Sequence, residues 1–135
     1  MKVILCLSDG GGMMFNKRRQ SRDKALIDDI GNLCADGVVF ISDFSLPLFE
    51  DGVADVIAVS NPLSAAGVGD YAFVENLQLH DFADKIEEMI IYKWNRVYPK
   101  DLTLDLYPDE IGFKLCESVD FKGQAHEKIT REIWR

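Results

Sequence analysis

The stretch Val3-Ile4-Leu5-Cys6-Leu7, which runs into Ser8-Asp9-Gly10, decides the fold class of this chain. A continuous apolar run that stops at polar turn residues is typical of a strand buried on both faces of a parallel sheet. The run is too short for a signal peptide, and no small-residue cleavage site follows it. We therefore predict a central first strand and expect a site where that strand ends.

Helix and strand patterns alternate after this strand. From Ser21 the apolar residues take a helical spacing, with Ser21 as the predicted N-cap and Asp23 in the first turn, and the helix is expected to end between Gly31 and Gly37. Further along, the pattern predicts strands at 38–41, 56–59, 71–74 and 90–94, helices at 45–49 and 81–89, and a loop or frayed turn at 64–70.

The C-terminal part changes character. Apolar and polar residues alternate at 102–106, 113–116 and 129–134, which is the period of half-exposed antiparallel strands. The predicted architecture is therefore α/β: a mixed sheet flanked by helices, with antiparallel strands at its C-terminal edge. A chain of 135 residues without a linker or repeat is expected to be a single domain, 1–135.

Charge and cysteine content narrow the class of partners. The chain carries 23 acidic and 15 basic side chains, a formal net charge of −8. This disfavours membrane surfaces and a long nucleic-acid footprint, so an anion site must be a local basic patch. No stretch approaches the ~20 apolar residues of a membrane span. Cys6, Cys34 and Cys116 are isolated thiols, which suits a reducing cytoplasm.

The segment from Gly10 to Asp23 has the most site-like composition. Its glycines, its basic residues and the start of the following helix would present backbone N–H groups and guanidinium groups to an anion. The G-K-[ST] sequence of a P-loop and the dinucleotide fingerprint are both missing. The alternative is a flexible surface loop whose arginines pair with the chain's own carboxylates. The residues assigned to ligand binding in this segment are Gly11, Gly12, Asn16, Arg18, Arg19 and Arg22.

Asp23 and His126 are the candidate catalytic residues. Asp23 is either a proton-handling carboxylate or a partner of the helix dipole, and His126 is either an acid/base group or a turn residue before the last strand. A Ser/His/Asp hydrolase can be assembled from Ser21 or Ser8 with His126, although no G-x-S-x-G motif accompanies them.

The segment from Trp94 to Asp101 follows a predicted strand and combines aromatic, amide and guanidinium groups. These groups could stack on and hydrogen-bond a heterocycle, so Asn95 and Arg96 join the ligand-binding candidates. The alternative is a strand end with its aromatic residues in the core. No spacing makes a zinc set, no motif supports a two-metal site from Asp9, Asp23 and Asp43, and no cofactor is assigned.

The order of predicted elements resembles the dihydrofolate reductase fold over nearly the whole chain. Residues 4–7 are similar to that family's first strand, Gly12 to Asn16 to its mobile loop, and Asp23 to its substrate-binding acid. Residues 86–92 resemble its A-D-x-x-Y-L-T junction, and 126–134 resemble its final strand. At the family's two cofactor-phosphate turns this chain has 42–45 (S-D-F-S) and 75–76 (E-N), where carboxylates would repel a phosphate. The resemblance implies the fold rather than NADPH chemistry.

The chain also resembles a group of short bacterial proteins. The shared segments are G-M-x-F-N-x-R-R-Q-S-R-D at 12–23, W-N-R-x-Y-P-x-D at 94–101 and H-E-K-I-T at 126–130. Some members are labelled ribonuclease Z, a metal-dependent phosphodiesterase that uses an H-x-H-x-D-H cluster. With His80 and His126 as its only histidines, this chain does not supply that cluster.

These observations together predict binding of a phosphate-bearing small molecule, a nucleotide or a nucleotide-like metabolite, at the segment 10–23, with chemistry as an open addition. Two alternatives stay open. One is a non-catalytic interaction or regulatory module that docks an acidic partner through its arginines. The other is an NADPH-dependent reductase with an atypical cofactor site.

Overall fold

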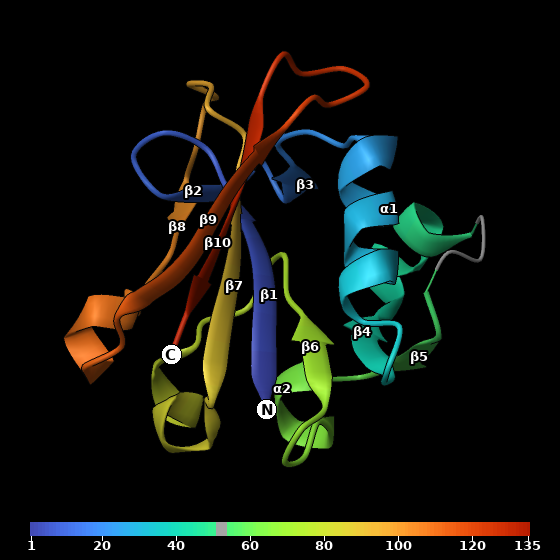
Figure 1. Cartoon of the computed structure of the whole chain (residues 1–135), viewed down its shortest axis with the longest axis vertical. Coiled ribbons are helices and arrows are strands. Elements are labelled where there is room, and N and C mark those ends of the chain that lie inside the picture. Colours follow the sequence, from blue (N-terminus) through green and yellow to red (C-terminus); the bar gives the residue numbers. More distant parts are fainter. Residues whose placement is uncertain (51–53) are drawn as a thin grey trace.

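The computed structural model of the chain describes residues 1–50 and 54–135. Its strands form a seven-stranded sheet and a small three-stranded sheet, ordered β3-β2-β8 (Figure 1). The large sheet has the order β5 (Val56–Val59), β4 (Val39–Ser42), β6 (Tyr71–Phe73), β1 (Lys2–Leu7), β7 (Glu88–Lys93), β10 (Ile129–Trp134) and β9 (Leu115–Phe121). β1 lies at the centre of this sheet, as its apolar run predicts.

The large sheet is mixed in the predicted way. From β5 through β4, β6 and β1 to β7, each strand is parallel to the next one in the sheet. β10 then pairs with β7 in the antiparallel direction, and β9 pairs with β10 as an antiparallel edge strand. The α/β class and the antiparallel strands at the C-terminal edge are therefore confirmed.

The elements outside the large sheet are two α-helices, three 3₁₀ helices and the strands of the small sheet. They are α1 (Lys24–Leu33), α2 (Pro62–Ala65), β2 (Gly12–Phe15), β3 (Arg18–Arg19), β8 (Leu102–Thr103), η1 (Asp43–Phe49), η2 (His80–Lys85) and η3 (Pro108–Ile111).

Each face of the sheet has its own core. On one face, α1 packs Leu26 and Ile30 against Ile4 and other sheet residues. On the opposite face, Val3 and Leu5 of β1 meet the segments around α2, η2 and β8. Because successive side chains of a strand point to opposite faces, the continuous apolar run of β1 supplies both cores.

The segment from Gly10 to Asp23 is more regular than the open loop that its composition predicts. β2 and β3 form a hairpin, and the residues between them, Asn16 and Lys17, have φ of 52° and 60°. Left-handed backbone at both positions is the requirement of a tight primed turn, for which Asn is well suited. The helix then begins two residues later than expected, because Asp23 rather than Ser21 is its N-cap and Oδ1 of Asp23 accepts a hydrogen bond from the Ala25 N–H.

The helix predicted at 81–89 is wrong beyond Lys85. Phe82, Ile86 and Met89 have a helical spacing, but the chain forms the short η2 and then enters β7 at Glu88. Met89 lies beside Val3 of β1 and is fully buried. The spacing of these apolar residues suits a helix as well as a strand, and pairing with β1 selects the strand.

Smaller differences occur elsewhere. Within the alternating segment 102–106, the described strand β8 covers Leu102–Thr103, and the strand expected at 113–116 begins at Leu115 and runs to Phe121. No helix within residues 1–50 and 54–135 combines the length and apolar character needed to cross a membrane.

Candidate functional site

The candidate site lies where the central parallel strands end. From β1 the chain passes through α1 on one face to reach β4, whereas from β6 it passes through η2 on the other face to reach β7. Adjacent strands whose connections leave over opposite faces open a crevice at their carboxyl ends, which is where open α/β sheets bind ligands. A narrow cavity of about 20 Å³ occupies this position and has side chains from Cys6, Asp23, Phe73, Glu75 and Trp94 in its lining.

A buried carboxylate–imidazole pair forms the centre of the site. His126, from the turn between β9 and β10, places Nδ1 2.9 Å from Oδ2 of Asp23 at the start of α1, and both side chains are almost completely buried. The structure thus brings together the two residues that the sequence proposes for proton transfer, across 103 positions of the chain.

The protonation pattern of this pair follows from the contacts of Asp23. Burial alone would raise the pKa of Asp23, but hydrogen bonds from His126 and from the backbone N–H groups of Gln124, Ala125 and Ala25 outweigh it and lower the pKa below its usual value. An ionised carboxylate only accepts hydrogen bonds, so Nδ1 of His126 must donate. In the neutral imidazole, Nε2 then carries the free lone pair.

Two hydroxyl groups lie within hydrogen-bond distance of Nε2 of His126. Nε2 of His126 lies 2.9 Å from the hydroxyl oxygen of Tyr98 and 3.1 Å from Oγ of Ser21, and the Tyr98 hydroxyl donates to Ser21 over 3.4 Å. The indole of Trp94 stacks on the imidazole with ring centroids 4.5 Å apart. The stacked ring and the carboxylate fix the orientation of His126, so the arrangement can move a proton between a hydroxyl group and the imidazole.

The predicted arginines have different surroundings. Arg19 is held by Glu75 through hydrogen bonds of 2.9 and 3.1 Å, donates to the Phe44 carbonyl and lies over the Phe44 ring. In contrast, Arg18, Arg22 and Arg96 are exposed and make no ion pair within the described residues.

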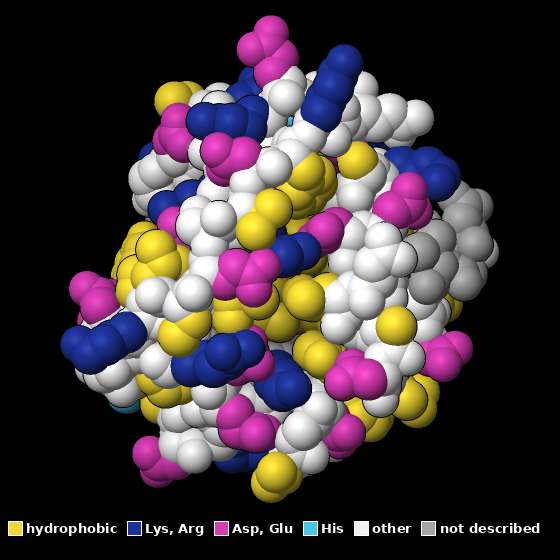
Figure 2. All heavy atoms as spheres, viewed as in Figure 1, with side chains coloured by type: hydrophobic (Ala, Val, Ile, Leu, Met, Phe, Trp, Pro, Cys, Tyr) yellow, Lys and Arg dark blue, Asp and Glu magenta, His cyan; other side chains and the backbone are white. Residues whose placement is uncertain are grey.

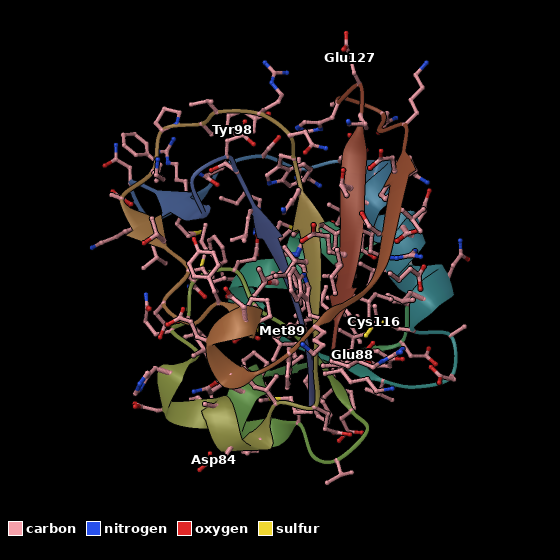
Figure 3. All side chains as sticks on the ribbon, turned by 60° about the vertical axis from the view of Figure 1, so that its left-hand side comes forward. Asp84, Glu88, Met89, Tyr98, Cys116 and Glu127 are labelled. Atoms are coloured by element: carbon pink, nitrogen blue, oxygen red, sulfur yellow. The ribbon has the colours of Figure 1, made fainter. Side chains whose placement is uncertain are left out.

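Each of the three exposed arginines lies beside Ser21 or Tyr98. Arg22 follows Ser21 in the chain and lines the cavity with it. Arg18 and Tyr98 line a neighbouring hollow, and the guanidinium of Arg96 lies 5.6 Å from the Tyr98 ring centroid. Figure 3 shows Tyr98 at the same end of the molecule as Glu127, which follows His126, whereas Asp84 lies at the opposite end. Basic side chains therefore gather around Ser21 and Tyr98.

The other predicted ligand-binding residues contact the protein itself. A Cβ atom at Gly11, whose φ is 78°, would lie 2.0 Å from the Tyr107 hydroxyl, so the space beside this glycine is already filled. A Cβ atom at Gly12 would clash with Oγ of Ser8 and with Nε2 of Gln20. Asn16 forms the hairpin turn, and its N–H donates to Asp101. The amide of Asn95 donates to the Lys128 carbonyl and to Thr130.

Three contributors to the site were missed as such by sequence reasoning. From the sequence, Tyr98 is only one of the aromatic residues of the segment 94–101, Glu75 is only a departure from a phosphate-binding turn, and nothing points to Gly123. The signal for Tyr98 was its place shortly after a buried strand that ends at the same sheet edge as β1. No sequence signal points to Gly123, whose importance depends on how the β9–β10 turn wraps around Asp23.

Within the described part of the chain, no three His, Cys, Asp or Glu side chains gather closely enough to hold a metal ion. In comparisons with protein-family models and with curated protein sequences, no match to the chain is found. The site must therefore be interpreted from its own geometry.

Proposed function

We propose that the protein binds a phosphate-bearing small molecule, a nucleotide or a nucleotide-like metabolite, at the carboxyl ends of β1 and β6. The observation that carries this proposal is the placement of Arg18, Arg22 and Arg96 around two hydroxyl groups that contact a buried carboxylate–imidazole pair. Guanidinium groups bind phosphate oxygens through forked, charge-assisted hydrogen bonds.

The net negative charge of the chain makes a local group of exposed arginines unusual. With a net charge of −8, the protein as a whole repels anions, and acidic and basic side chains are intermixed over the face seen in Figure 2. Arg18, Arg22 and Arg96 make no ion pair among residues 1–50 and 54–135, whereas Arg19, Arg131 and Arg135 are paired, so the first three are available to an external anion. The plane of Arg96 beside Tyr98 also offers a surface on which a heterocycle can stack.

We further propose a dihydrofolate-reductase-like fold and membership of the group of short bacterial proteins that the three sequence segments resemble. Support for the fold is the chain order: a central first strand, a long excursion, a helix, parallel strands and a closing antiparallel pair. Cytoplasmic location is part of the proposal and agrees with three free thiols.

NADPH-dependent reduction is a weaker alternative. Glu75 follows β6, where the resembled family has a phosphate-binding turn, and its carboxylate accepts hydrogen bonds from Arg19 and from Ser45. In this arrangement Arg19 is already paired with a protein carboxylate, and that carboxylate lies where the cofactor phosphate would bind.

Docking of an acidic protein partner is the second candidate function. The small volume of the cavity favours docking at the surface.

A thermal-shift series with inorganic phosphate, nucleoside mono-, di- and triphosphates and NADPH tests the proposal. A ligand at a hundred times its Kd should stabilise the fold by about 2.7 kcal/mol. The double variant Arg18→Ala/Arg22→Ala should lose the shift, whereas Lys114→Ala, an exposed cation before β9, should retain it. A shift that is equal in both variants would show that the anion binds elsewhere.

A further inference from the structure

We infer that Ser21 is the nucleophile of a hydrolytic site for short-chain carboxylic esters, with His126 as its general base and Asp23 as the residue that positions His126. The inference rests on the proposed function only for the phosphate group that the natural ester would carry. The chemistry at the hydroxyl group is argued from the geometry of residues 21, 23, 98 and 126.

A serine hydroxyl becomes a useful nucleophile when a neighbouring base takes its proton. Oγ of Ser21 lies 3.1 Å from Nε2 of His126, and Nδ1 of the same ring lies 2.9 Å from Asp23. Carboxylate, imidazole and hydroxyl thus form a continuous chain within hydrogen-bond reach, as hydroxyl activation requires. Because Asp23 accepts the Nδ1 proton, the tautomer with a free lone pair on Nε2 is the one in place.

In the hydrogen-bonded chain of Asp23, His126 and Ser21, the serine is the member most accessible to a substrate. The side chains of His126 and Asp23 are 2% and 0% exposed, whereas Ser21 is only half-buried and lines the cavity. Among the described residues, the hydroxyl groups within hydrogen-bond distance of Nε2 are those of Ser21 and Tyr98. Ser8, the other serine considered from the sequence, is buried beside Gly12, and its Oγ has no hydrogen-bond partner among the described residues.

Tyr98 supplies a second hydroxyl at the same place. The neutral imidazole has one lone pair on Nε2, so only one of the two hydroxyls can donate to it at a time. When Ser21 donates its proton to Nε2, the Tyr98 hydroxyl is free to donate to an oxygen next to Ser21. A donor in that position stabilises the oxyanion that develops during attack on an ester carbonyl.

The reaction then balances as two transfers. In the first, the Ser21 proton moves to Nε2, Oγ bonds to the carbonyl carbon, the bond from that carbon to the alcohol oxygen breaks, and Nε2 returns the proton to the leaving alcohol. In the second, water loses a proton to Nε2 and its oxygen bonds to the acyl carbon, the bond from that carbon to Oγ breaks, and Nε2 returns the proton to Oγ as the carboxylic acid leaves.

The size of the cavity sets the acyl group. The cavity beside Ser21 is narrow, about 20 Å³, which favours the shortest acyl groups, such as acetyl. The phosphate-bearing part of the substrate would then remain at the surface, where Arg18, Arg22 and Arg96 lie.

Covalent labelling with methanesulfonyl fluoride, a small uncharged probe, tests the nucleophile independently of the arginines. The full chain is treated with the probe, and the modified residue is located by mass spectrometry after chymotrypsin digestion. We expect modification at Ser21, its loss in Ser21→Ala and its retention in Ser118→Ala, an exposed serine on β9. Modification that persists in Ser21→Ala, or that falls on Tyr98, would overturn the inference, as would no reaction in the wild type.

Turnover of p-nitrophenyl acetate tests the base. His126→Gln should slow hydrolysis about 100-fold or more, and Tyr98→Phe should still be labelled at Ser21. If His126→Gln fails to fold, the acid limb of the wild-type rate profile replaces it, because protonation of the imidazole must abolish the reaction. A pH-independent rate, or Ser21-dependent turnover of p-nitrophenyl phosphate in place of the acetate, would contradict the mechanism.

The outcomes separate the two proposals. Labelling of Ser21 without any nucleotide shift would retain the nucleophile and reject the phosphate ligand. A nucleotide shift that depends on Arg18 and Arg22, without labelling of Ser21, would retain the binding site and reject the hydrolytic chemistry.

Discussion

A Cβ atom at Gly123 would lie 2.6 Å from Oδ2 of Asp23 and 2.8 Å from the carbonyl oxygen of His126. Only a residue without a side chain lets the β9–β10 turn approach closely enough for the N–H groups of Gln124 and Ala125 to donate to that carboxylate. Gly123 is therefore required for space at the centre of the candidate site.

Substitution of this glycine should accordingly be costly. We expect Gly123→Ala to lower the free energy of unfolding by about 1–3 kcal/mol, because the turn must move away from Asp23. Urea denaturation measures the change. The control is Gly67→Ala, where the Cβ would lie 3.5 Å from Asp70, an ordinary contact, and the change should stay within about 0.5 kcal/mol. Equal effects of the two substitutions would contradict the packing argument.

Stability in acid should depend on Asp23. Its pKa in the folded protein lies below the usual value, so the fold favours the ionised form. This contribution is complete above the usual pKa of about 3.9 and is lost as the pH falls through the lower folded value.

The variant Asp23→Asn should therefore be less stable than the wild type at neutral pH, and the difference should narrow below about pH 4. Denaturation curves at a series of pH values measure it. Asp84→Asn, at an exposed carboxylate at the far end of the molecule in Figure 3, is the control and should show no such narrowing. A difference that is constant with pH would show that Asp23 acts only through packing.

Stability in alkali should depend on Tyr92. Burial, with a 2.6 Å hydrogen bond to Asp29, raises the pKa of Tyr92 far above its usual value of about 10. The unfolded chain then releases this proton at a lower pH than the fold does, so the free energy of unfolding falls as the pH rises through about 10. Tyr92→Phe should cost about 1–3 kcal/mol at neutral pH and less at high pH. Parallel pH curves for the two proteins would refute this.

The cysteines should react at very different rates. Burial, and secondarily the charge of Asp36, raises the pKa of Cys34 to about 12, and burial with Glu75 also raises the pKa of Cys6. Because the thiolate is the reactive form, both should react slowly with an aromatic disulfide reagent near pH 8. Cys116, exposed on β9 (Figure 3), should account for a single fast phase. That phase should disappear in Cys116→Ser, and all 3 thiols should react in denaturant. Several fast thiols in the native state would contradict the burial argument.

The sheet could be predicted largely from the sequence because its strands are apolar runs bounded by turn residues. β1, β4, β5 and β6 all lie within about two residues of their predicted positions. The prediction failed where a spacing suited two structures, as at Phe82, Ile86 and Met89, because pairing with β1 decides the outcome there. It also failed at the β2–β3 hairpin, since Asn16-Lys17 lacks the glycine that normally signals such a turn.

The site was predictable in part. Asp23 and His126 were chosen for their chemistry, and the structure brings them together, but their roles stay predictions. The sequence alone could not separate the arginine that pairs with a protein carboxylate from those open to a ligand, because only the folded chain brings Arg19 to Glu75. The meeting of Ser21, Tyr98 and His126 depends on three segments that are distant in the sequence and adjacent only at the sheet edge.

The central place of β1 also affects how the chain is made. In the sheet, Lys2 lies beside Tyr71 of β6 and Glu88 of β7. At about 5–20 residues per second of synthesis, β1 leaves the ribosome on the order of 10 s before both neighbours exist. During this interval its apolar run has no native partner. Newly made chains should therefore depend on chaperones more than the stability of the finished fold would suggest, and slower translation should lower the yield.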